Sequence, residues 1–102
     1  MVGVPHLTGR QKVYTAIVIL ASAPGKIEER LEAAYRMAIA VIDAQLDIPP
    51  QLSGEFLKLR TELQKEFFNP PSSRFGSAAD RRKWASDAAT RLVAFYDKLA
   101  RL

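Results

Sequence analysis

The chain has 102 residues, which is the length of one domain and enough to bury a single hydrophobic core without disulfides or metals. Its 48% hydrophobic content excludes wholesale disorder, and the absence of cysteine excludes disulfides, thiolate nucleophiles and zinc sites built on cysteine. The net charge of +4 is a mild excess that permits a polyanionic partner without requiring one. Because small secreted domains often carry disulfides, this composition favours a cytoplasmic location.

The first predicted element is a helix over residues 8–22, after a flexible tail over residues 1–7. The run from Val13 to Gly25 carries no charge and contains residues that also favour strands, but no second strand-like run exists to pair with it. With basic residues before it, this run also resembles a secretory signal segment. It is too short to cross a bilayer, so we favour the first helix of the fold and keep processing as the alternative.

A second helix is predicted over residues 26–46, separated from the first by Pro24 and Gly25. Its apolar stripe, flanked by Tyr35 and Ile42, consists of Ile27, Leu31, Ala34, Ala38 and Val41. Glu32 and Arg36 stand four residues apart and are expected to pair on the surface of this helix.

Two further helices show the clearest periodicity. The third begins at Pro49 and Pro50 and ends at Asn69. Its stripe consists of Leu52, Phe56, Leu59, Leu63 and Phe67. The fourth begins at Ser77, where Asp80 completes a variant of the capping box. Its stripe consists of Ala85, Ala88, Leu92, Phe95, Leu99 and Leu102.

These elements make one all-helical domain over residues 1–102. The connections are short apart from the stretch between about Asn69 and Gly76, and short connections make neighbouring helices antiparallel. The sequence therefore predicts an all-α fold, an up-and-down antiparallel four-helix bundle.

Several segments resemble those of a group of small bacterial proteins. They are Arg10-Gln11-Lys12-Val13-Tyr14, Ile27-Glu28-Glu29-Arg30-Leu31, Ala34-Tyr35, and Pro50 followed by Phe56-Leu57-Lys58-Leu59. The chain is similar in these segments to small uncharacterised bacterial all-helical proteins of about the same length. The resemblance spans much of the chain and implies a bacterial origin and a helical fold, but no activity.

Residues that could carry catalysis are scarce. His6 lies in a segment expected to fray, with no nucleophile or orienting partner indicated. Asp43 and Asp47 share a helix face and could bind magnesium, but no third ligand is indicated, so we expect Asp47 to cap the following helix. No glycine-rich phosphate loop is present. We therefore predict no enzyme activity, no cofactor and no metal.

Basic and aromatic residues gather around the start of the fourth helix. The candidate phosphate- or nucleic-acid-binding residues are Arg74, Arg81, Arg82, Lys83 and Trp84. Cations at a helix N-terminus oppose the helix dipole, and such a choice can mark a functional site. Against this interpretation, Glu62 and Glu66 are expected to lie nearby and offset the charge, with Trp84 at the edge of the core.

The apolar arcs of the first two helices are wider than one bundle is expected to cover. Ala16 to Ala21 and Met37 to Ile42 are continuous apolar runs. We therefore predict a homodimer through the outer faces of these helices, with Val18, Ile19, Met37 and Ile39 at the interface.

The leading hypothesis for function is a non-enzymatic helical protein-interaction module, such as an adaptor, a chaperone-like partner or a regulatory subunit. It would bind itself, another protein or both, and no membrane. The alternative hypothesis is a regulator that binds nucleic acid or phosphate through the basic residues of positions 74–84.

Overall fold

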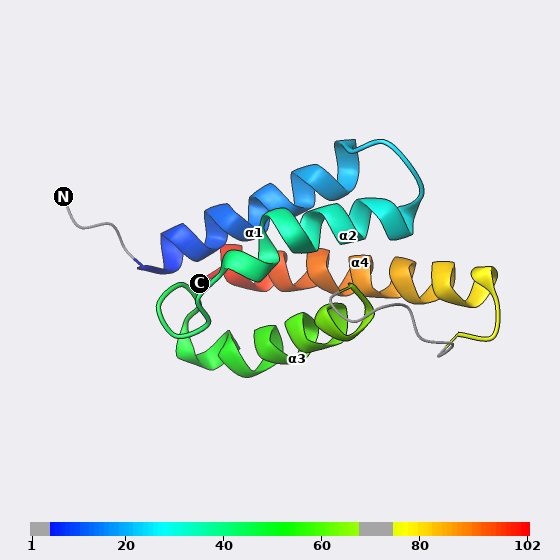
Figure 1. The fold of residues 1–102 in the computed structure, drawn as a ribbon. Coiled ribbons are helices and arrows are strands. Elements are labelled where there is room, and N and C mark those ends of the chain that lie inside the picture. Colours follow the sequence, from blue (N-terminus) through cyan, green and yellow to red (C-terminus); the bar gives the residue numbers. More distant parts are fainter. Residues whose placement is uncertain (1–4, 68–74) are drawn as a thin grey trace.

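The computed structural model describes residues 5–67 and 75–102, with side chains from Gly9 onward. This part of the chain forms four α-helices and one short 3-10 turn, and it contains no strand. The elements are α1 (Pro5–Ser22), α2 (Ile27–Met37), η1 (Ile39–Val41), α3 (Pro50–Phe67) and α4 (Ala78–Ala100). Successive helices run in opposite directions (Figure 1), which confirms the predicted all-α antiparallel four-helix bundle.

The last helix occupies the centre of the arrangement. In Figure 1, α4 lies between α3 on one side and the α1–α2 pair on the other, and it packs against all three. Its predicted stripe is buried at Ala85, Ala88, Leu92, Phe95 and Leu99. The predicted stripe ends one turn early, because α4 ends at Ala100 and Leu102 is 61% exposed.

The third helix follows the prediction closely. It begins at Pro50, and Phe56, Leu59, Leu63 and Phe67 are buried. The ring of Phe56 meets that of Phe95 on α4, with 5.8 Å between centroids. The predicted end at Asn69 lies outside the described residues.

The first helix starts earlier than predicted. It begins at Pro5 instead of Thr8, since proline fits the first helical position, where its missing N–H removes no hydrogen bond. Residues 5–7 of the predicted tail therefore belong to α1, and residues 1–4 lie outside the described residues. Gly25, with φ of 104°, makes the turn into α2 that a residue with a Cβ would strain.

The second helix is shorter than predicted, because α2 ends at Met37 instead of reaching Leu46. Backbone groups that would form the next helical hydrogen bonds have side-chain partners instead. Arg60 Nη1 donates to the Ile42 carbonyl at 2.7 Å, and the N–H of Leu46 donates to Asp43 Oδ1 at 3.0 Å. An aspartate that binds nearby backbone N–H groups competes with helix formation in this way.

This early end changes which side chains face the core. The 3-10 turn η1 directs Ile39 inward, where it is fully buried, and leaves Val41 60% exposed. The predicted stripe is therefore wrong at Val41. Ile42 stays buried, so the apolar run from Met37 to Ile42 divides between core and surface.

No helix in residues 5–67 or 75–102 is long and apolar enough to span a membrane.

Candidate functional site

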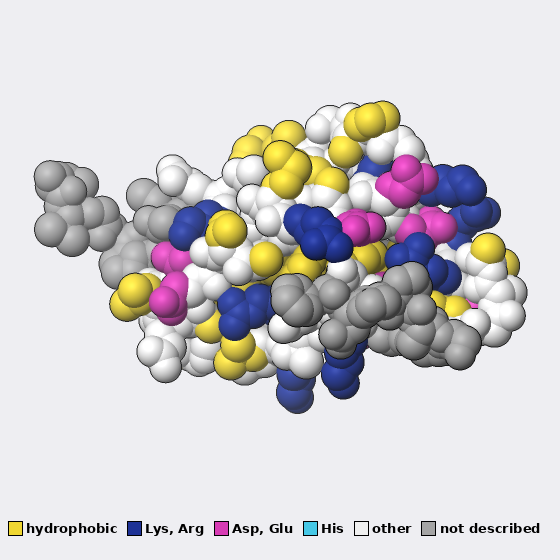
Figure 2. Space-filling view, viewed as in Figure 1, with side chains coloured by type: hydrophobic (Ala, Val, Ile, Leu, Met, Phe, Trp, Pro, Cys, Tyr) yellow, Lys and Arg dark blue, Asp and Glu magenta, His cyan; other side chains and the backbone are white. Residues whose placement is uncertain are grey.

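The basic residues at the start of α4 form ion pairs with carboxylates of other helices. Arg81 Nε lies 2.5 Å from Glu66 Oε2 of α3, and the Glu66 side chain is only 2% exposed. Arg82 Nε lies 3.8 Å from Oε1 of Glu28, in the first turn of α2. Figure 2 shows basic and acidic side chains interleaved at the end of the molecule where α2 and α4 begin. The predicted offset by Glu66 is confirmed, and Arg81 holds α4 against α3.

Trp84 belongs to the edge of the core, as the alternative interpretation predicted. Its Nε1 donates to Glu62 Oε1 at 2.9 Å, and its ring packs against those of Phe67 and Phe75, with centroids 5.7 and 5.6 Å away. Glu62 also pairs with Arg91 Nη2 at 2.7 Å, and this hydrogen bond raises the pKa of Arg91. The indole is therefore packed among protein rings, an arrangement unlike a platform for nucleotide bases.

Lys83 is the member of the predicted cluster that stays available. It is exposed and forms no ion pair among the described residues. Arg74 lies outside the described residues. Of the five predicted binding residues, the structure thus places Arg81, Arg82 and Trp84 in contacts between helices and leaves Lys83 facing solvent.

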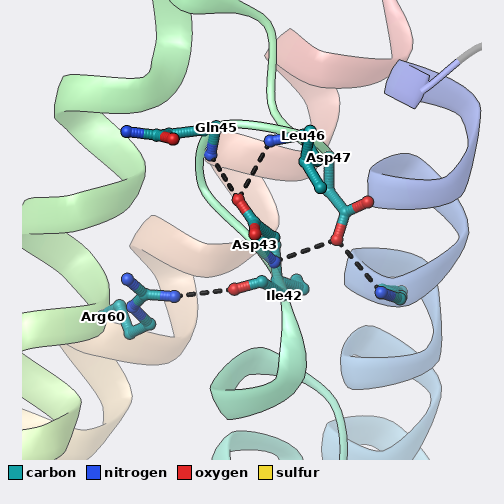
Figure 3. A network of polar contacts seen from close by, with 7 residues as sticks. Ile42, Asp43, Gln45, Leu46, Asp47 and Arg60 are labelled. Carbon is teal, nitrogen blue, oxygen red and sulfur yellow. Dashed lines mark hydrogen bonds and ion pairs between the residues drawn. The ribbon is translucent and has the colours of Figure 1, made fainter.

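A second polar network ties the loop after η1 to α1 (Figure 3). Asp47 Oδ2 accepts the N–H of Asp43 at 2.9 Å and Lys12 Nζ at 3.0 Å. Asp43 Oδ1 accepts the N–H of Gln45 at 2.8 Å. The two aspartates therefore hold a turn, and the expectation that Asp47 caps the next helix is wrong. No group of three or more possible metal ligands lies together within the described residues.

The loop reaches α1 because position 9 has no side chain. A Cβ on Gly9 would lie 2.8 Å from the carbonyl carbon of Asp47 and closer still to its carbonyl oxygen, which is far inside van der Waals contact. Lys12, one turn further along α1, then reaches the Asp47 carboxylate. The Gly9–Asp47 contact, which we call the loop clamp, is absent from the sequence predictions, since it joins residues 38 positions apart with no shared motif.

The Asp47 carboxylate makes stability depend on pH. Burial alone would raise the pKa of Asp47, but the hydrogen bond from Asp43 N–H and the hydrogen bond and charge of Lys12 outweigh it and lower the pKa below 3.8. A carboxyl with a lowered folded-state pKa stabilises the fold above its unfolded pKa and loses this contribution as pH falls through the folded value.

We therefore expect the free energy of unfolding to fall from about pH 4 downward more steeply in the parent than in Asp47→Asn. Urea titrations between pH 7 and pH 2 measure this difference. Parallel curves for the two proteins would show that Asp47 contributes nothing to the acid sensitivity.

Two arginines donate to backbone carbonyls across a hollow that lies between α2, η1 and α3. Arg36 Nη2 donates to the carbonyl of Phe67 at 2.6 Å, and Arg60 donates to that of Ile42. The hollow, of about 410 Å³, is lined by Tyr35, Arg36, Ala40, Arg60 and Gln64. Arg36 also pairs with Glu32 at 2.8 Å, as predicted. Both arginines are thus fixed by the fold, and they satisfy the carbonyls of Phe67 at the end of α3 and of Ile42 after η1.

The outward surface of α1 has a different character. Between Lys12 and Lys26 the chain carries no charge, and Tyr14 and Val18 are 54% and 42% exposed. The hydroxyls of Thr15 and Ser22 donate to carbonyls of α1 itself, at 3.0 and 2.6 Å. This surface therefore presents aliphatic and aromatic groups, and its Thr15 and Ser22 hydroxyls already have acceptors within the helix.

The apolar surface continues from α1 onto α4. The ring of Tyr14 meets that of Tyr96, with 5.8 Å between centroids, and Val93, one turn from Tyr96, is 47% exposed. The Thr90 hydroxyl also donates within its own helix, to Ser86 at 3.0 Å. We call Tyr14, Val18, Val93 and Tyr96, with the exposed small residues beside them, the α1/α4 face.

The predicted dimer residues do not all reach the surface. Val18 is exposed, Met37 is 68% exposed, and Ile19 is half-buried against the core. Ile39 is fully buried, so it belongs to the intramolecular core and cannot form the centre of an interface on the folded chain. Val18 and Met37 are therefore the two predicted interface residues that remain well exposed on the folded chain.

No family model, curated protein or solved structure matches the chain.

Proposed function

We propose that this chain is a non-enzymatic helical protein-interaction module that self-associates. The observation that carries the proposal is the outward surface of α1, which has no charge between Lys12 and Lys26 and whose Thr15 and Ser22 hydroxyls are bonded within the helix. Removing such a surface from water strands no charge, and the Thr15 and Ser22 hydroxyls keep their acceptors, so the cost of burying polar side-chain groups is confined to the Tyr14 hydroxyl.

The mechanism is docking of one helical face on another. Burial of apolar surface contributes about 25 cal/mol per Å², and the exposed side chains of Tyr14 and Val18 are the groups that would lose water. The module would work as an adaptor, a chaperone-like partner or a regulatory subunit in the cytoplasm. Nothing in this mechanism requires a cofactor.

The alternative is binding of nucleic acid or phosphate at the start of α4. The net charge of +4 and the exposure of Lys83 support it. The pairing of Arg81 with a buried carboxylate weighs against it, because a phosphate would have to compete with Glu66 for the guanidinium. Self-association is therefore the function we favour.

Light scattering coupled to size exclusion tests the proposal. We expect a species of twice the 11.4 kDa chain mass at micromolar concentration, which dissociates on dilution. The measurement is repeated after nuclease treatment. A chain that stays monomeric up to millimolar concentration would contradict self-association, and a monomer that binds duplex DNA only at low salt would favour the alternative.

A further inference from the structure

We propose that the α1/α4 face is the self-association surface and that its occupant is a second copy of this chain, with the two α1 helices antiparallel across a two-fold axis near Val18. This inference rests on the proposed function, since it specifies where and how the copies meet. It moves the interface away from the outer surface of α2, where the sequence predicts half of it.

A stable dimer needs more surface than α1 alone provides. A stable dimer buries about 800 Å² on each partner. A helix of 18 residues is about 27 Å long and about 10 Å wide, so α1 alone supplies too little. The α1/α4 face widens this strip, because the Tyr14–Tyr96 contact joins the two helices and Val93 extends the apolar surface along α4.

The distribution of charge over the surface favours a second copy as the partner. Each copy carries a net charge of +4, so the copies repel unless they meet where charge is absent. Other helix surfaces of the described chain carry exposed basic side chains, among them Arg36, Lys58, Lys65, Lys83 and Arg91. The outward side of α1 carries none between Lys12 and Lys26. A charge-free surface on a basic protein favours a partner with the same property, and a second copy supplies it.

The shape of the α1 surface around Val18 suits a symmetric pair. On a helix, the nearest surface neighbours of Val18 are three or four residues away: Tyr14, Thr15, Ala21 and Ser22. Three of these are small, so Val18 projects above the spaces beside it. In a two-fold arrangement the Val18 of each copy fills the space beside the other, as the self-complementary patch of a symmetric dimer requires.

The antiparallel direction follows from the ends of α1. In a parallel pair the two Arg10 residues would lie at the same end of the interface, and the helix dipoles would be aligned. An antiparallel pair separates these basic groups and opposes the dipoles. Residues 15 and 22 then lie opposite each other, because both are about equally far from the centre of the pair.

Val18→Glu is the direct test, with Leu57→Glu as its matched control. Val18 is 42% exposed and Leu57 on α3 is 41% exposed, so the two substitutions disturb the folded monomer to a similar degree. We expect Val18→Glu to weaken dimerisation at least about 100-fold, because each interface gains two facing carboxylates, with the helical circular dichroism unchanged. Leu57→Glu should dimerise like the parent.

Cysteine cross-linking tests whether the two α1 helices are antiparallel. Introduced cysteines can be paired without interference because the chain has no cysteine of its own. Under oxidation, a mixture of Thr15→Cys and Ser22→Cys should form the mixed disulfide in preference to either symmetric one. Symmetric disulfides at both positions would indicate parallel helices and overturn the proposed arrangement. No cross-link in a dimeric mixture would place the interface elsewhere.

The outcomes separate the two levels of the proposal. A monomeric parent overturns the proposed function and this inference together. A dimeric parent whose Val18→Glu variant dimerises equally well overturns the α1/α4 face alone. If Val18→Glu loses helical structure, the cross-linking result decides, because Thr15→Cys and Ser22→Cys replace exposed residues with side chains of similar size.

Discussion

Gly9→Ala should lower the free energy of unfolding by about 3 kcal/mol. The added methyl group would clash with the carbonyl oxygen of Asp47 and lie 2.8 Å from its carbonyl carbon, and both are backbone atoms that no rotamer change can move. The loop must therefore retreat from α1, which also breaks the contact of Lys12 with Asp47. At about 4–8 °C per kcal/mol, the melting temperature should fall by more than about 10 °C.

The same substitution at Gly54 provides the control. Gly54 is in the interior of α3, is exposed, and a Cβ added there would meet no atom within 4 Å. Because alanine favours a helix over glycine by up to about 1 kcal/mol, Gly54→Ala should stabilise the fold. Opposite signs for the two variants in thermal melts would establish the loop clamp, whereas equal shifts would reject it.

Arg81→Ala should lower the free energy of unfolding by about 2–4 kcal/mol, measured by urea unfolding. Its removal strands the carboxylate of Glu66, which is 2% exposed and accepts from Arg81 Nε. The effect should be smaller than for a fully buried pair, because the Arg81 side chain is 34% exposed. The guanidinium also lies 5.9 Å from the centre of the Phe67 ring, and that contact is lost as well.

Two further variants test whether the unpaired Glu66 carboxylate causes the loss of stability. Lys83→Ala, two residues along α4, removes an exposed cation without a carboxylate partner among the described residues and should change stability by less than about 0.5 kcal/mol. The double variant Arg81→Leu with Glu66→Leu removes both charges and should recover much of the loss. A double variant as unstable as Arg81→Ala would mean that the stranded carboxylate is not the reason.

The sequence predicted the fold correctly where the periodicity within one helix determines which of its side chains are buried. The stripes of α3 and α4 repeat every three or four residues between clear proline and serine boundaries, and Phe56, Leu63, Leu92 and Phe95 are buried accordingly. The end of α2 was not predictable in this way. In the segment that follows, Arg60 of another helix takes the Ile42 carbonyl, and periodicity contains no information on such a contact.

Predictions about the candidate sites also succeeded or failed according to whether they assumed the correct helices. The expectation that carboxylates of α3 offset the basic residues of α4 needed only antiparallel packing, and Arg81 with Glu66 confirms it. The expectation for Ile39 depended on a continuous helix and failed when η1 turned that side chain inward. The exposed hydroxyl residues of α1 gave no signal in the sequence, since serine and threonine bond to water or to the helix backbone with equal ease.

The central place of α4 determines the order in which the chain can complete its core during synthesis. The other three helices each turn apolar residues toward α4, which is the last of the four to be translated. Until it appears, the rings of Phe56 and Phe67 lack the partners Phe95 and Trp84. The helices α1, α2 and α3 can pack against one another earlier, but the nascent chain leaves the residues that face α4 exposed to chaperones and proteases until α4 arrives.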